Sequence, residues 1–178
     1  MSVSALFLRA DRAEHRLCLI ANAAARRRAL RGLFRTVSRL GDGVVWYALM
    51  ASMPLWLGPA AGARAALHML AVGAVGLALY KLLKRTLVRE RPFIGLIGIE
   101  CAMPPLDRYS FPSGHTLHAV AFTVLAVGYV PWQAVLLVPF AVLVAASRVV
   151  LGLHYPSDVA VGALLGALLA SSSFALVA

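Results

Sequence analysis

The order of apolar and polar residues divides the chain into five long hydrophobic stretches and an N-terminal region where apolar and basic residues are interleaved. The five stretches are residues 43–62, 64–83, 114–130, 131–147 and 157–177. Each is close to the ~20 residues that a helix needs to cross a bilayer, although the third and fourth are a little short. Because backbone polar groups in lipid must pair within the segment, these stretches predict helices and not strands. We therefore expect an all-α integral membrane protein with about five transmembrane helices.

The N-terminal region has a different pattern. Between residues 5 and 39, leucines and phenylalanines are interleaved with arginines, which is typical of an amphipathic helix lying in the membrane interface. A sixth crossing is the alternative, but no charge-free window here is long enough. The charges near the start also argue against a removable signal peptide. The expected organisation is a basic amphipathic region, 1–42, followed by a five-span domain, 43–178.

Composition agrees with a membrane protein. Hydrophobic residues make up 61% of the 178 residues and charged residues 13%, whereas globular proteins carry about 25% charged residues. The net charge is +10, and nine arginines precede residue 42. Basic flanks beside a membrane, together with a phosphate site, account for this charge better than nucleic-acid binding, which we do not expect. Cys18 and Cys101 have no metal-binding or redox spacing.

The number of spans determines which polar segments share a side of the membrane. If the second span ends on one side, the third begins there, and the fourth ends and the fifth begins there as well. The irregular segments 84–113 and 148–158 are therefore expected at the same end of the bundle. These segments hold every candidate catalytic residue.

The first candidate group lies at the end of the second span. Lys84 and Arg91 are seven residues apart, so they share a face if the helix continues to Pro92, where we expect it to stop. Two cations on one face at a membrane boundary suit either a phosphate or lipid headgroups. Arg85 and Arg89 point elsewhere on that helix, and for them we predict headgroup contacts.

The second group opens the third span. Ser113 suits the N-cap of a helix, and Gly114 allows the backbone to approach an oxyanion closely. A helix N-terminus offers free N–H groups and the positive end of the helix dipole. His115 follows, where it could transfer a proton. Taken alone, this group is better explained by an ordinary helix cap beside a histidine than by a functional site.

The third group precedes and opens the last span. Pro156 suits the first turn of that helix, and His154 and Asp158 are four residues apart, so the carboxylate can reach one ring nitrogen. That contact would leave the other nitrogen free to attack. Arg148 supplies a planar fork suited to phosphate. Charged residues beside long apolar helices are costly unless they function or pair, which favours a functional site.

Together the three groups resemble the type 2 phosphatidic acid phosphatase (PAP2) superfamily, which also contains the vanadium haloperoxidases. The matching patterns are Lys-x6-Arg-Pro at 84–92, Pro-Ser-Gly-His at 112–115 and Ser-Arg-x5-His-x3-Asp at 147–158. They cover the chain from Lys84 onward, in order and with suitable loop lengths. The resemblance implies a haloperoxidase-like helical bundle.

The same resemblance implies a phosphoric ester hydrolase that requires no metal or other cofactor. In it His154 would attack phosphorus and form a phosphohistidine, Asp158 would hold that imidazole, and His115 would protonate the leaving oxygen. The phosphoryl group would be bound by Lys84, Arg91, Ser113, Gly114 and Arg148.

Several remaining polar residues receive no catalytic role. His118 lies one turn from His115, and we predict a hydrogen-bonded core histidine there. His68 and His15 have no assigned function. Asp107 lies in the loop after the second span, where a solvated or locally paired acid is expected.

Four other classes of function are weighed against a phosphatase. A lipid phosphotransferase would use the same phosphohistidine and differs only in the acceptor. A vanadate-dependent oxidase is disfavoured because such members of the superfamily are soluble, and a zinc hydrolase because the spacing is wrong and cations lie nearby. A transporter would need broken helices or polar residues at mid-membrane, and the candidate residues lie at one boundary.

The expected substrate is a membrane lipid with a terminal phosphate or diphosphate, entering from the bilayer. The loop 93–110 is short, which favours a small headgroup: phosphatidate, phosphatidylglycerol phosphate, or a polyprenyl phosphate or diphosphate such as undecaprenyl diphosphate. The expected location is the plasma (inner) membrane. With five spans the arginine-rich N-terminal region lies on the active-site side, and the positive-inside rule then favours the cytoplasmic face. PAP2-like membrane phosphatases usually act on the opposite face, and a hidden span before residue 43 would restore that orientation.

Overall fold

A computed structural model of the chain describes residues 3–177. Over these residues the chain is helical and contains no strand. The α-helices are α1 (Val3–Ala23), α2 (Arg28–Arg39), α3 (Val45–Leu57), α4 (Pro59–Thr86), α5 (Pro92–Gly95), α6 (Gly114–Tyr129), α7 (Ala134–Val150) and α8 (Pro156–Val177). Shorter helical turns lie at Ala24–Arg26 (η1), Leu40–Val44 (η2, a π-helix) and Pro131–Gln133 (η3).

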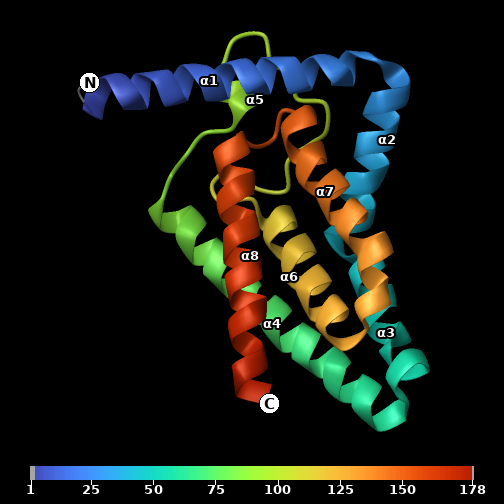
Figure 1. Cartoon of the computed structure of the whole chain (residues 1–178). Coiled ribbons are helices and arrows are strands. Elements are labelled where there is room, and N and C mark those ends of the chain that lie inside the picture. Colours follow the sequence, from blue (N-terminus) through green and yellow to red (C-terminus); the bar gives the residue numbers. More distant parts are fainter. Residues whose placement is uncertain (1–2, 178) are drawn as a thin grey trace.

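The long helices form a bundle with α1 lying across one end of it (Figure 1). The chain bends at η1, and α2, η2 and α3 then run away from that end beside α7 as a single rod. Helix α4 returns obliquely, and α6 lies in the middle of the bundle, packed against α7 and α8. We call the end that carries α1, α5 and the loop after α4 the α1 end.

Three helical segments of the described chain are long and apolar enough to cross a membrane: Pro59–Thr86, Pro131–Val150 and Pro156–Leu176. Helix α3 has 13 residues and α6 has 16, so the expected count of five spans stays a prediction. The boundary between the first two expected spans differs from the structure. The chain turns at Gly58, whose φ of 78 favours glycine, and α4 begins at Pro59.

The N-terminal region also differs from the single interfacial helix expected over residues 5–39. Helix α1 lies across the bundle, but α2 packs along α7 and continues into α3. The expected boundary after residue 42 falls inside η2, in the middle of this rod. The N-terminal residues therefore contribute directly to the bundle beside the candidate site.

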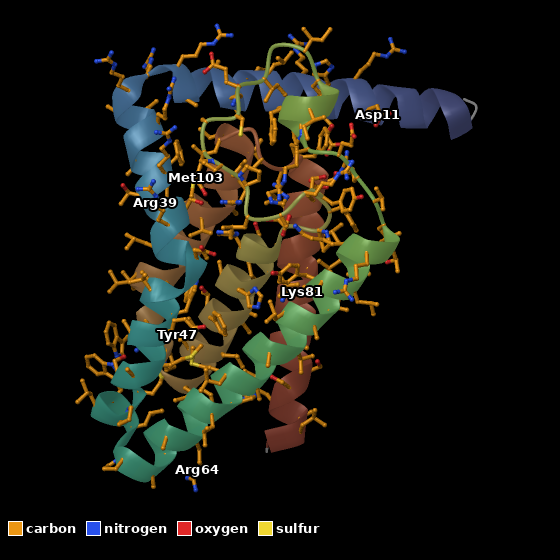
Figure 2. The ribbon with its side chains drawn as sticks, turned by 180° about the vertical axis from the view of Figure 1, so that it is seen from behind. Asp11, Arg39, Tyr47, Arg64, Lys81 and Met103 are labelled. Carbon is orange, nitrogen blue, oxygen red and sulfur yellow. The ribbon has the colours of Figure 1, made fainter. Side chains whose placement is uncertain are left out.

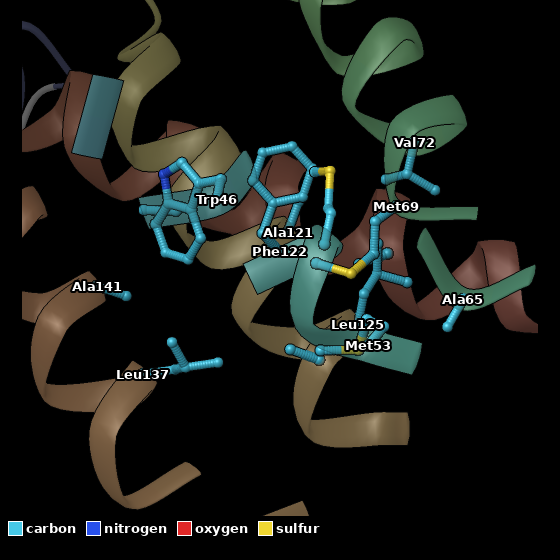
Figure 3. Packing of buried hydrophobic residues seen from close by; sticks show 14 of the residues in the cluster. Trp46, Met53, Ala65, Met69, Val72, Ala121, Phe122, Leu125, Leu137 and Ala141 are labelled. Atoms are coloured by element: carbon cyan, nitrogen blue, oxygen red, sulfur yellow. The ribbon is translucent and has the colours of Figure 1, made fainter. Parts of the chain in front are cut away.

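The hydrophobic core lies between α3, α4, α6 and α7 (Figure 3). The Trp46 ring lies 5.6 Å from that of Phe122 and 5.5 Å from that of Phe140, measured between centroids. Met53 and Met69 are completely buried beside them. The flexible thioethers fill the irregular space between helices that cross at an angle.

Helices α6 and α8 approach each other through glycines. A Cβ on Gly162 would lie 2.6 Å from the Ser113 carbonyl oxygen, and one on Gly166 would lie 2.3 Å from that of Leu117. Small residues allow such close backbone contact between membrane helices. This contact holds the N-terminus of α6 against the start of α8.

Candidate active site

The three candidate groups meet at the α1 end, as the span count predicted. They line one end of a cavity of about 390 Å³. The polar residues at that end are Asp42, Lys84, Arg91, Asp107, His115, Arg148 and His154. The Ser113 N–H donates to the Asp158 carbonyl oxygen over 3.1 Å, which joins the second group directly to the third.

Lys84 and Arg91 lie together, although not for the reason expected. Helix α4 ends at Thr86, so the two cations do not share a helical face. Arg91 precedes α5 in extended conformation, and Pro92 begins that short helix instead of stopping α4. Both cations converge on Asp107 Oδ1, which accepts from Lys84 Nζ and from Arg91 Nη2 at 2.6 Å each.

Asp107 therefore belongs to the candidate site, although sequence reasoning assigned it no catalytic role. Burial alone would raise the pKa of Asp107, but the hydrogen bond and charge of Lys84, with the charge of Arg91, outweigh it and lower the pKa. The carboxylate is ionised and neutralises part of the cationic cluster. Its only sequence signal was an acid in the loop between two basic motifs.

The second group opens α6 as predicted, with Ser113 at the N-cap position and Gly114 as the first helical residue. The Ser113 hydroxyl pairs with the Thr116 hydroxyl at 2.9 Å and not with a free N–H. His115 lies one residue further and points into the cavity, where its Nε2 is 3.2 Å from Asp42 Oδ1. The helix N-terminus and His115 therefore both face the space where the cations converge.

Asp42 is a second residue that the sequence did not single out. It lies in η2, next to Gly43, whose φ of 142 kinks the helical rod at this point. The kink presents the Asp42 carboxylate to the cavity, beside His115. A Gly-Asp-Gly run in the rod was the available signal.

His154 is almost completely buried between cations and a carboxylate. Its Nδ1 lies 3.6 Å from Asp158 Oδ2, and its Nε2 lies 3.3 Å from Arg91 Nη1. A guanidinium only donates hydrogen bonds, so this contact requires the lone pair on Nε2 and leaves the proton on Nδ1, facing Asp158. Burial and the charges of Arg148 and Arg91 hold the pKa of His154 well below its usual range. The ring is neutral at pH 7, with the lone pair on Nε2 directed toward the cations.

Arg148 completes the cationic end of the cavity. Its side chain is buried, and its Nη1 donates to the Ser38 hydroxyl from α2. Within the described chain its Nε has no hydrogen-bond partner. A buried guanidinium with an unused donor at the edge of the cavity is suited to hold an anion.

Two histidines without a catalytic role, His118 and His68, are hydrogen-bonded within the bundle. His15 remains without an assigned role. His118 contacts the carbonyl oxygens of Gly114 and Gly73 at 2.9 and 3.1 Å, as predicted for a core histidine, and it also lines the cavity. His68 lies between the hydroxyls of Tyr129 and Ser173.

Away from its charged end, the cavity is apolar. Helices α3 and α4 join at the Gly58 turn and diverge toward the α1 end (Figure 1). Trp46 and Met50 of α3, and Leu70 and Leu77 of α4, line the cavity between them. Leu70 and Leu77 are also exposed on the outside of the bundle, so the apolar wall reaches the surface that faces the surrounding medium.

A model of the PAP2 superfamily matches residues 65–178. The chain belongs to this superfamily. That assignment agrees with the resemblance carried by the three motifs. Because several helical segments are also long and apolar enough to cross a bilayer, the chain is a multi-pass membrane protein.

Solved PAP2-type structures have the same architecture. The chain superimposes on LpxE from Aquifex aeolicus with a TM-score of 0.76 and 26% identity, covering 89% of this chain and 93% of that one. For a transmembrane PAP2-type phosphatidylglycerolphosphate phosphatase from Bacillus subtilis the TM-score is 0.73 and the identity 25%, covering 94% of this chain and 85% of that one.

Curated relatives extend the comparison. Decaprenylphosphoryl-5-phosphoribose phosphatase of Mycobacterium tuberculosis is 41% identical over 115 residues, which cover 63% of this chain and 55% of the relative. Phosphatidylglycerophosphatase B of Haemophilus influenzae is 44% identical over 77 residues, which cover 38% of this chain and 32% of the relative. The PAP2 chain described here thus matches just over half the length of the mycobacterial relative.

Proposed function

We propose that the chain is a membrane phosphatase that hydrolyses the terminal phosphate or diphosphate of a lipid. The observation that carries this proposal is the cavity itself. One end gathers three cations, a helix N-terminus and two histidines, and the other is an apolar wall that reaches the outside of the bundle between α3 and α4. A phosphate headgroup fits the first part and a hydrocarbon chain fits the second.

The first half of the reaction forms a phosphohistidine. The lone pair on His154 Nε2 attacks phosphorus, the bond between phosphorus and the lipid oxygen breaks, and His115 donates a proton to that oxygen. Lys84, Arg91 and Arg148, with the Gly114 N–H, stabilise the charge that spreads over the phosphoryl oxygens. Asp158 stabilises the positive charge that His154 gains.

The second half releases inorganic phosphate. His115, now neutral, takes a proton from a water molecule, whose oxygen attacks phosphorus while the bond to His154 Nε2 breaks. His154 returns to its neutral form and His115 to its protonated form. The charge of the cationic groups replaces the role that a divalent metal has in many phosphoryl-transfer enzymes, so we propose a metal-independent reaction.

The names of the relatives support a phosphorylated lipid as the substrate. They are phosphatases of a decaprenyl-linked phosphoribose and of phosphatidylglycerophosphate, and an undecaprenyl-diphosphatase from Sulfolobus acidocaldarius. The candidates for this chain are therefore phosphatidate, phosphatidylglycerol phosphate, and polyprenyl phosphates, including those with a sugar phosphate. Release of phosphate from each of these lipids by the purified protein would identify the preferred class.

Trapping of the intermediate tests the nucleophile. Acid-labile 32P is expected on the protein after rapid quenching with a labelled lipid phosphate, and His154→Ala is expected to abolish it. His115→Ala is expected to slow turnover while still permitting some label. His68→Gln, a buried histidine outside the cavity, is the matched control and should trap label normally. Full labelling of the His154→Ala protein would refute the assignment.

The same assay separates the other classes of function. Release of inorganic phosphate without an added acceptor excludes an obligatory phosphotransferase, and chemical turnover excludes a transporter without enzymatic activity. Activity that persists in EDTA excludes a catalytic zinc ion. Complete loss of activity in EDTA, restored by a divalent metal, would contradict the metal-independent mechanism.

A further inference from the structure

Arg89 contacts Asp158, the carboxylate beside His154, directly. Its Nη1 donates to Asp158 Oδ1 at 2.7 Å, and its guanidinium lies 3.7 Å from the centre of the Tyr155 ring. The backbone beneath it is held as well, because the Arg89 carbonyl oxygen accepts from the N–H and hydroxyl of Ser110. The side chain is thus aimed at Asp158 from a fixed backbone.

The carboxylate that Arg89 contacts has no exposure to solvent. Asp158 Oδ2 accepts the Tyr155 N–H at 2.9 Å and lies 3.6 Å from His154 Nδ1. With Oδ1 bound to Arg89, the plane of the carboxylate is set, and the position of Oδ2 relative to His154 is set with it. Arg89 also supplies the opposite charge that an ionised carboxylate needs when it is buried.

Arg89 is itself held by α1. Its Nη2 donates to Glu14 Oε2 at 2.7 Å, and the other oxygen of Glu14 accepts the Ser157 N–H at 2.8 Å. Glu14 therefore contacts both Arg89 and the first turn of α8, where a negative charge is favourable. A continuous series of polar contacts runs from α1 through Arg89 and Asp158 to His154.

We infer that Arg89 is a positioning residue for catalysis, which holds Asp158 in place beneath His154 and is in turn held by Glu14 of α1. The inference rests on the proposed role of His154 as the nucleophile. Arg89 is absent from the residues that line the cavity, so it acts through Asp158 and not on the phosphate. Glu14 makes α1 part of the catalytic apparatus rather than a membrane anchor alone.

The test compares kcat and KM of purified variants with a lipid phosphate in detergent micelles. Arg89→Gln is expected to lower kcat by about 10- to 100-fold, as is typical when a partner that orients a functional ligand is removed. KM should stay within about twofold, because no contact with the phosphate is lost. Arg89→Lys keeps the charge and should recover part of kcat. Arg85→Gln, an exposed arginine four residues away, is the matched control and should equal the wild type.

Double-mutant cycles separate positioning from a general effect on folding. In an Asp158→Asn background, Arg89→Gln should cost less than about threefold, since residues that act as a unit are not additive. Glu14→Gln should lower kcat less than Arg89→Gln, and the Glu14→Gln/Arg89→Gln protein should be no worse than Arg89→Gln. If Arg89→Gln fails to fold, Arg89→Lys and Glu14→Gln carry the test, and wild-type kcat in both overturns the inference.

Three further results would also overturn it: wild-type kcat in Arg89→Gln, an equal loss in the Asp158→Asn background, or a raised KM with unchanged kcat. A wild-type protein that releases no phosphate from any lipid would instead contradict the proposed function, so the two failures are distinguishable.

Discussion

The two histidines of the candidate site have different polar partners. His154 contacts a guanidinium on one side, whereas His115 contacts the carboxylate of Asp42 at 3.2 Å. A guanidinium contact requires a free lone pair on the ring, and a carboxylate can accept a hydrogen bond from a ring N–H. At the scale of single residues, this difference supports His154 as the nucleophile and His115 as the acid.

A first prediction concerns the protonation of His154. We expect its imidazole to be neutral at pH 6.5 in the substrate-free protein, because burial and the charges of Arg148 and Arg91 lower its pKa. Below pH 6.5 the unfolded chain then binds a proton that the folded chain does not, so folding stability falls as the pH falls. 15N NMR of histidine-labelled protein, with His154→Asn to assign the resonance, measures the midpoint. A midpoint at or above pH 6.5 would contradict the assignment.

A second prediction concerns the leaving group. The Asp42 carboxylate lies beside His115 in the cavity, where the proposed reaction protonates the leaving oxygen. A hydroxyl on the leaving group can donate to it, as the ribose or glycerol of two relatives' substrates could. Asp42→Asn is therefore expected to reduce kcat/KM for a phosphoribosyl or glycerol phosphate lipid about tenfold more than for a polyprenyl phosphate without hydroxyls.

Comparison of the two substrates is the internal control for this variant. Any disturbance of His115 affects both substrates, so only their ratio reports the hydroxyl contact. An unchanged ratio would show that Asp42 acts solely on His115.

At the scale of elements, the site depends on how closely α6 and α8 pack. Helix α6 presents Gly114 and His115 at its N-terminus, and the start of α8 carries Asp158. Gly162 and Gly166 bring the two backbones together along this contact. Close packing of these helices therefore fixes the distance between His115 and Asp158.

Replacement of one of these glycines should separate the helices. Gly166→Ala would place a Cβ 2.3 Å from the Leu117 carbonyl oxygen, and we expect a loss of stability of about 1–3 kcal/mol, typical of overpacking. Gly32→Ala in α2 is the matched control, since nothing lies within 4 Å of its added Cβ. It should be neutral or stabilising by about 0.4–1 kcal/mol. Thermal unfolding in detergent measures both, and equal melting temperatures would refute the packing argument.

At the scale of the whole molecule, basic side chains gather at one end. Figure 2 shows nitrogen-tipped side chains along α1, whereas Arg64 is labelled at the opposite tip of the bundle. The loop after α4 lies at the α1 end as well (Figure 1). By the positive-inside rule, this distribution agrees with the expectation from the sequence that the site faces the cytoplasm.

Cysteine labelling tests this orientation. Native Cys101 is exposed in the loop at the α1 end, and Cys18 is buried. In Cys18→Ala protein, a membrane-impermeant maleimide is expected to label Cys101 only after permeabilisation of the cells. A Cys18→Ala/Cys101→Ala/Arg64→Cys protein, with its thiol at the far end, should be labelled in intact cells. The reverse pattern would place the active site on the extracytoplasmic face.

Local chemistry made much of the candidate site predictable. Ser113 suits a helix start and Pro156 a first turn, and both positions begin helices in the structure. Counting hydrophobic stretches was enough to expect the three motifs at one end. By contrast, the continuation of α4 to Pro92 was wrong, because Lys84 and Arg91 are joined by a shared carboxylate and not by a helical face.

The sequence by itself determined the apolar segments, the places where helices begin and the three candidate motifs, because each depends on residues close together in the chain. Only the tertiary structure decided which acids pair with these motifs. Asp42, Asp107 and Glu14 lie in different segments, and nothing local distinguishes them from solvated acids. Their partners are set by the crossing of α1 over the bundle, the kink in the α2–α3 rod and the path of the loop, all of which depend on long-range packing.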